Sequence, residues 1–179
     1  IKPMTTFKER IHLDLKDYLT GLDLVDKRLP ECPDLDACRN QLLEAYLPDG
    51  VREFNAYPTV SLGWMMFLGM AWAEFWDKDW SRYAAEPQLY EQVRDVRGYD
   101  CMDEYILEEV LHLDATLTDR VNRVVNECAA RTLSNLRHAD VEPGTPEAFH
   151  AYVDCLSELY TFGAAMHLKH LGYHMTLID

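Results

Sequence analysis

The sequence predicts an all-α protein, a single-domain bundle of five or six helices over residues 1–179, and three observations lead to this prediction. Apolar residues recur at spacings of three and four along most of the chain, which is the period of an amphipathic helix. Residues that favour helix starts and ends stand where these periodic segments stop. No segment alternates with the period of a strand, and no repeat or change of composition marks a second domain.

Caps, prolines and glycines give the expected helix boundaries. In chain order, the helices are expected to begin after Thr5 or Thr6, after Asp34, at about Pro58, at Pro87, after Asp100 and after Thr145. We expect the second helix to stop at "PDG" (48–50), so that "VREFNAYP" forms a loop. The fifth is expected to reach about His138, with a possible bend at "DATLTD" (114–119), and the last to end near Leu171 because Gly172 follows.

The most apolar segment is "YPTVSLGWMMFLGMAWAEFW" (57–76). Only about 15 residues separate Pro58 from Glu74, so a helix there spans roughly 22 Å, less than the ~30 Å hydrocarbon core of a bilayer. No basic cluster flanks the segment. It therefore predicts a buried central helix, with the long helix and the last helix packed on it, and no membrane span.

Composition and charge narrow the class of protein further. Apolar residues make up 48% and charged residues 27% of the chain, as in ordinary globular domains. The net charge of −14 repels phosphate groups, so we expect neither nucleic acid nor an anionic membrane as a partner.

The cysteines indicate the compartment. Five cysteines are scattered without a CxxC pair, which is typical of reduced thiols in a cytoplasmic protein. The chain opens on "IKPMTTFKER", which does not begin with Met and has no apolar signal segment, so the removal of a leader before Ile1 stays an open alternative.

Three histidines near the end of the chain are the best candidates for chemistry. They stand in "GAAMHLKHLGYHM" (163–175) as His167, His170 and His174. On a helical projection they continue the apolar stripe of the last helix. Imidazoles three or four residues apart on a helix can share a metal ion, so His170 can pair with either neighbour.

The sequence therefore carries a candidate metal site made of His167, His170, His174 and Glu74. Glu74 is included because it is the only charged residue on the hydrophobic helix before its end. A mixed imidazole and carboxylate site suits Zn²⁺, Ni²⁺ or Fe²⁺. The segment "HLGYH" is similar, over five residues, to the histidine pattern of DinB-like metal-binding bundles, although the further histidine of that pattern has no counterpart here.

Each of these residues also has a purely structural interpretation. His167 and His170 can be helix-end residues favoured by the helix dipole, with His174 in the following tail. Glu74 can mark a helix end and pair with Lys78 four residues on. A catalytic histidine without metal is a further alternative, and the sequence leaves open whether the protein is an enzyme.

Trp64, Trp72, Trp76 and Trp80 recur at multiples of four, so they share one side of a helix. Such a row can line a ligand pocket, form an interface or pack in the core. With the known catalytic motifs absent, the sequence favours a soluble, non-catalytic domain that binds a protein partner or a second copy of itself. The alternative is a metal-binding bundle, which could be a metal-dependent enzyme, that uses the histidines.

Overall fold

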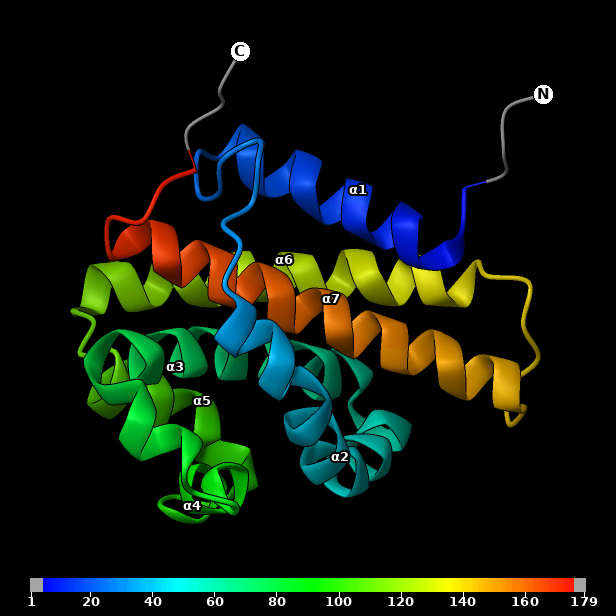
Figure 1. Ribbon diagram of the computed structural model, residues 1–179. Helices are drawn as coiled ribbons and strands as arrows, with labels where there is room; N and C mark the ends of the chain where they lie inside the picture. Colours follow the sequence, from blue (N-terminus) through cyan, green and yellow to red (C-terminus); the bar gives the residue numbers. More distant parts are fainter. Residues whose placement is uncertain (1–4, 176–179) are drawn as a thin grey trace.

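The computed structural model describes residues 5–175, and these form helices, turns and no strand. The ends of the predicted domain, residues 1–4 and 176–179, lie outside the described residues. The described part has seven α-helices rather than five or six, because the segment expected to form one long helix is divided into a short α5 and a long α6 (Figure 1). The elements are α1 (Phe7–Gly21), α2 (Pro33–Ala56), α3 (Pro58–Ala84), α4 (Leu89–Asp95), η1 (Tyr99–Cys101), α5 (Met102–Tyr105), η2 (Ile106–Val110), α6 (Ala115–Arg137) and α7 (Pro146–His170).

Three helices begin directly after a residue whose side chain caps them, and these residues are Thr6 for α1, Asp114 for α6 and Thr145 for α7. The Thr6 hydroxyl accepts a hydrogen bond from the amide of Glu9 at the start of α1. Thr145 does the same for Ala148 at the start of α7, where Pro146 occupies the first helical position. These two starts confirm the boundaries expected from the sequence, because a capping oxygen satisfies an amide that has no partner within the helix.

The prediction that α2 stops at residues 48–50 is wrong, since the helix continues through Pro48 to Ala56. Proline lacks the amide that the helix needs, so contacts from elsewhere must hold this turn in place. Asp49, buried, accepts hydrogen bonds from Tyr90 and Arg94 of α4, at 2.6 and 3.0 Å. The Ser61 hydroxyl donates to the Gly50 carbonyl at 2.7 Å, which ties the same turn to α3.

The prediction of one long helix from Asp100 to His138 is also wrong, because the helix is interrupted between residues 110 and 115. The π-helical turn η2 ends there, His112 adopts a left-handed conformation with φ of 53°, and Asp114 caps the new helix α6. The Asp114 carboxylate accepts a hydrogen bond from the Leu117 amide at 2.8 Å. The apolar period continues through this region and therefore predicts a single helix. The Asp114 cap instead starts a separate helix, α6.

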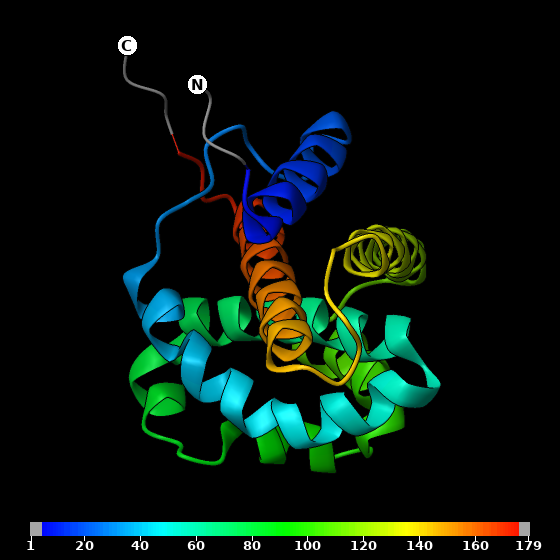
Figure 2. The same ribbon diagram turned by 90° about the vertical axis from the view of Figure 1, so that its right-hand side faces the viewer.

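The core lies mainly between α3 and α7. α7 contacts α1, α2, α3 and α6, while α3 contacts α2, α6 and α7. Figure 2 shows α7 between α1 and α6 on one side and α2 and α3 on the other. The hydrophobic segment of α3 is buried on most sides from Ser61 to Phe75. α3 and α7 thus supply the longest runs of buried positions, and α1, α2, α4, η2 and α6 add further buried residues around them.

Two glycines allow α3 and α7 to approach closely. A Cβ atom at Gly69 of α3 would overlap the carbonyl oxygen of Tyr160, and one at Gly163 of α7 would overlap the carbonyl oxygen of Met66. Backbone meets backbone at this crossing, so no side chain larger than hydrogen fits at either position. The close approach fixes where the C-terminal end of α7 lies relative to α3.

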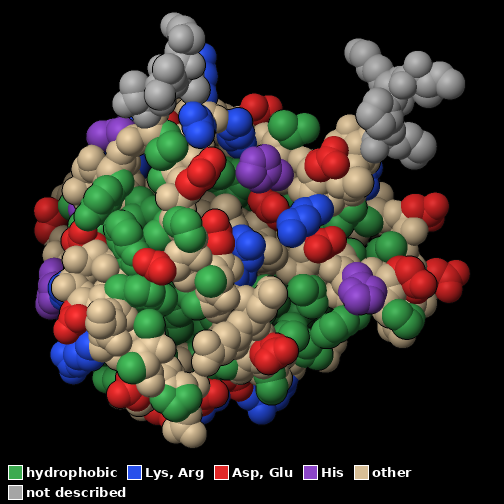
Figure 3. Space-filling model, viewed as in Figure 1, with side chains coloured by type: hydrophobic (Ala, Val, Ile, Leu, Met, Phe, Trp, Pro, Cys, Tyr) green, Lys and Arg blue, Asp and Glu red, His purple; other side chains and the backbone are tan. Residues whose placement is uncertain are grey.

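The surface carries apolar side chains among charged ones. Figure 3 shows apolar side chains gathered over the ends of α3 and α7 at the left of the view, with acidic and basic groups interspersed over the rest of that face. All five cysteines lie within the described range and are free thiols. Within residues 5–175, every helix falls short of the length or the apolar character that crossing a bilayer requires.

Candidate functional site

The three predicted histidines lie at the end of α7 but in different surroundings. His167 is buried, with 5% of its surface exposed, whereas His170 and His174 are exposed. The helix ends at His170, and Gly172 follows with φ of 102°, as expected for a glycine that ends a helix. His174 therefore lies outside the helix, where its Nδ1 is 3.3 Å from Asp26.

Glu74 and His167 are in direct contact. The Nε2 atom of His167 lies 2.6 Å from the Oε2 atom of Glu74. Because an ionised carboxylate can only accept, Nε2 carries the proton and donates it. Glu74 is also 3.8 Å from Lys78, so it contacts both the histidine and the lysine that the sequence offered as alternatives.

The environment of His167 favours the neutral imidazole. Burial lowers the pKa of His167 from its ordinary value, and this outweighs the opposite effect of Glu74. The ring of His170 stacks on that of His167, with centroids 5.7 Å apart, and its charge would lower the pKa further. Nδ1 of His167 makes no hydrogen bond within residues 5–175, which leaves a lone pair able to accept one.

The metal hypothesis named four residues, and the structure brings two of them into contact. Glu74 and His167 form the pair, His170 stacks beside it, and His174 pairs with Asp26 instead. Among the residues that the structure describes, no three His, Cys, Asp or Glu side chains are grouped so that they could hold a metal ion. Binding of Zn²⁺, Ni²⁺ or Fe²⁺ here stays a prediction.

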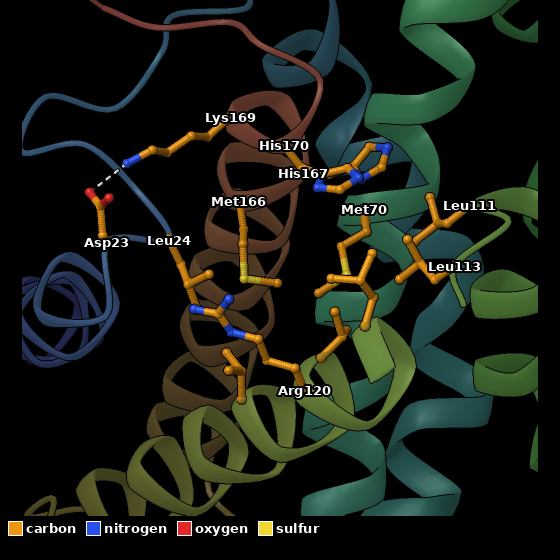
Figure 4. A pocket seen from close by; sticks show the side chains of 13 residues that line it. Asp23, Leu24, Met70, Leu111, Leu113, Arg120, Met166, His167, Lys169 and His170 are labelled. Carbon is orange, nitrogen blue, oxygen red and sulfur yellow. Dashed lines mark hydrogen bonds and ion pairs between the residues drawn. The ribbon is translucent and has the colours of Figure 1, made fainter. Parts of the chain in front are cut away.

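A cavity of about 260 Å³ opens beside this pair. It lies where the turn after α1 meets α3, α6 and α7, and Figure 4 shows the side chains around it. Most of the lining is apolar, and His167 and His170 form part of its wall. The lining residues are Asp23, Leu24, Met70, Leu111, Leu113, Leu117, Arg120, Val121, Val124, Met166, His167, Lys169 and His170.

One wall of the cavity is irregular backbone. Leu111 and Leu113 flank His112, the residue with φ of 53°, directly after the π-helical turn η2. The amides of Leu111 and Leu113 donate to the carbonyls of Ile106 and Leu107, at 2.8 and 3.0 Å, so this wall is well held. π-turns and left-handed residues other than glycine occur often at functional sites.

Two cations of different character border the cavity. Lys169 lies 2.9 Å from Asp23 and 3.0 Å from Asp26, so its charge is balanced. Arg120 of α6 is exposed and makes no ion pair within residues 5–175. Figure 4 shows its side chain reaching from α6 toward Leu24 and Met166. Sequence reasoning missed Arg120, because a single arginine on the polar side of a helix has no distinguishing pattern.

The tryptophans pack within the fold instead of forming an open face. Trp72 is buried, and none of the other three is exposed. The indole N–H of Trp64 donates to the carbonyl of Tyr99 at 2.7 Å, and that of Trp76 donates to Asp34 at 3.0 Å. Core packing accounts for these contacts, and Trp72 and Trp80 also line a second cavity of about 70 Å³, so the pocket interpretation stays a prediction.

Comparison with known proteins shows a distant likeness over part of the chain. No family model matches the chain, and no solved structure matches it. The chain is similar to DNA polymerase subunit gamma-2 of Bos taurus, with 30% identity over 102 residues. The match covers 52% of this chain and 20% of the relative, so it spans about a fifth of the curated protein's length.

Proposed function

We propose that this protein acts by binding a small, mainly apolar molecule in the cavity between α3, α6 and α7. The observation that carries the proposal is the cavity itself, about 260 Å³ with mainly apolar walls and a buried histidine on one of them. An apolar cavity of roughly 150 Å³ is enough to hold benzene, so a compact ligand of larger size fits here. Small-molecule sites typically combine apolar walls with a few polar groups that orient the ligand.

The polar groups on the walls suit this role. The Glu74 carboxylate holds the Nε2 proton of His167, so Nδ1 of the same ring is left as an acceptor for a ligand hydroxyl or amide. The irregular backbone at Leu111 to Leu113 supports the proposal as well, since it places two leucines on the wall that a regular helix would place elsewhere.

A neutral fluorescent probe tests the proposal. N-phenyl-naphthylamine, which is apolar and uncharged, is expected to bind the protein with increased emission. Val121, half-buried on the cavity wall, is replaced by Trp, whose side chain fills the space. We expect Val121→Trp to weaken binding by at least about tenfold, equivalent to ~1.4 kcal/mol.

The matched control is Val153→Trp on α7. Val153 is also half-buried against the core, but it does not line the cavity. This variant should bind the probe as the original protein does, and circular dichroism should show that both variants keep their helix content. Equal binding by Val121→Trp and the original protein would place the probe elsewhere and contradict the proposal.

Contact with a protein partner is a second candidate function. Its support is the likeness to a polymerase subunit, since a subunit by its name assembles with other chains. Exposed apolar residues supply surface for such a contact, and Tyr57 and Phe149 are the two most exposed aromatic examples in the described range, 63% and 46% exposed. Loss of partner binding in Tyr57→Ser or Phe149→Ser, with probe binding intact, would separate this function from the first.

A further inference from the structure

We infer that the ligand of the cavity is a small monocarboxylate, with its apolar part inside and its carboxylate at the mouth against Arg120. This inference rests on the proposed function, because it names the class of molecule that the same cavity would hold. It commits to a free small acid, and the end of a peptide chain is treated below as an outcome of the test.

The argument begins with the balance of charge at the cavity. The whole chain carries 17 Lys and Arg against 31 Asp and Glu, and what distinguishes Arg120 from the other exposed cations without an ion pair is that it borders the cavity. Of the charged residues that line the cavity, Lys169 is paired with Asp23 at 2.9 Å and also with Asp26, outside the lining, at 3.0 Å. Arg120 is then left with a full positive charge at the mouth, without an ion pair in the described part of the chain. A ligand with one negative charge balances it.

The second step concerns the shape of the charged group. A guanidinium presents a planar fork of N–H donors that matches the two oxygens of a carboxylate. The only negative group on the lining is Asp23, and Lys169 occupies it. Glu74 lies behind His167 and is already hydrogen-bonded to it, at 2.6 Å. Of the arginine and lysine side chains on the lining, Arg120 is therefore the one without an ion pair in the described part of the chain, while Lys169 is shared by Asp23 and Asp26.

The third step concerns how the molecule is oriented. Arg120 is exposed and reaches toward Leu24 and Met166, while the remaining wall is mostly leucine, valine and methionine (Figure 4). An amphipathic acid can place its tail among these side chains and keep its carboxylate partly in water beside Arg120. A charged group on the inner wall would lose its hydration, which is costly without a partner.

The experiment compares two ligands that differ only in the head group. Octanoate and octanol are used to displace bound N-phenyl-naphthylamine at neutral pH. We expect octanoate to bind more tightly than octanol. Arg120→Gln should weaken octanoate about tenfold, the loss of one charge-assisted hydrogen bond, and leave octanol unchanged.

Arg123→Gln is the matched control. Arg123 lies on the same helix and is also exposed, but it does not line the cavity. It removes the same net charge, so a general electrostatic effect on octanoate would appear in both variants, whereas recognition at the mouth appears only in Arg120→Gln.

Each result separates the ligand class from the proposed function. If the two ligands compete equally, or if Arg120→Gln weakens neither, the monocarboxylate inference is overturned while the cavity remains a binding site. If a capped dileucine with a free C-terminal carboxylate displaces the probe much better than octanoate, the site recognises a peptide end and the inference of a free acid is overturned. If Val121→Trp has no effect on any of these ligands, the proposed function itself fails.

Discussion

His167 is buried beside one carboxylate and one imidazole, and its protonation is therefore linked to the stability of the fold. Burial lowers its pKa below the ordinary value of about 6.5 that it has in the unfolded chain. At pH values between the pKa of His167 in the folded chain and its pKa in the unfolded chain, the unfolded chain binds more protons than the folded one. Folding stability therefore decreases as the pH falls through about 6.5, by up to about 1.4 kcal/mol per pH unit.

We predict that His167→Gln removes this part of the acid sensitivity. Glutamine keeps an N–H donor for Glu74 but does not titrate. Urea unfolding at several pH values should show the original protein losing stability relative to the variant between about pH 7 and pH 5. His150→Gln, at an exposed histidine on the same helix, is the control and should change nothing. A gain of stability for the original protein in acid would mean that pairing with Glu74 outweighs burial.

The sequence could predict the contact between Glu74 and His167, but it could not predict that Arg120 borders a cavity. Glu74 interrupts a long apolar run and His167 continues an apolar stripe, so both patterns place a polar group in the core. Two buried polar groups of opposite character tend to pair, since each otherwise lacks a partner. In the sequence pattern Arg120 lies on the polar side of a helix. The cavity beside it forms only because the folded chain brings residues 22–24 and 111–113 close to that helix.

At the scale of the helices, the crossing of α3 and α7 depends on two positions without side chains. We predict that Gly163→Ala lowers the free energy of unfolding by about 1–3 kcal/mol, because its Cβ would overlap the Met66 carbonyl and the helices would have to separate. Chemical denaturation followed by circular dichroism measures the change.

Gly21→Ala is the control for the same substitution in a helix. Gly21 ends α1, and a Cβ there meets nothing within 4 Å. Alanine is the better helix former by up to about 1 kcal/mol, so this variant should be as stable as the original protein or slightly more so. Equal destabilisation of the two variants would contradict the close approach at Gly163.

Helix starts were predicted better than helix continuity. Thr145 and Pro146 carry local signals, and α7 begins there. Whether a chain continues through a proline, or breaks inside a periodic stripe, depends on contacts from distant residues. Tyr90 and Arg94 hold Asp49 in a helical turn after Pro48, and they lie more than 40 residues further along the chain.

At the scale of the whole molecule, self-association stays a prediction. The four tryptophans do not form an exposed face for contact between two copies, since none of them is exposed. The exposed large apolar residues are distributed over several elements: Leu13, Leu22, Val51, Tyr57, Val96, Phe149 and Tyr173. Sedimentation at tens of micromolar protein, the range of weak dimers, measures association directly.

Charge sets the expected dependence of that association on salt. Each copy carries a net charge of −14, so two copies repel each other until counterions screen them. We predict that any dimer is more populated in about 0.5 M NaCl than in about 0.01 M NaCl. The reason is that the screening length falls from ~30 Å at the lower salt concentration to a few ångströms at the higher one. A monomer at both salt concentrations would contradict self-association.

The close pairing of α3 with α7 also has a consequence during synthesis. The ribosome completes α3 at Ala84, but α7 ends only at His170, about 86 residues later. At ~5–20 residues per second this takes roughly 4–17 s. During that interval the most apolar segment of the chain lacks the helix that covers most of it. We therefore predict that nascent chains of this protein are bound by chaperones that hold apolar segments, until the last helix has left the ribosome.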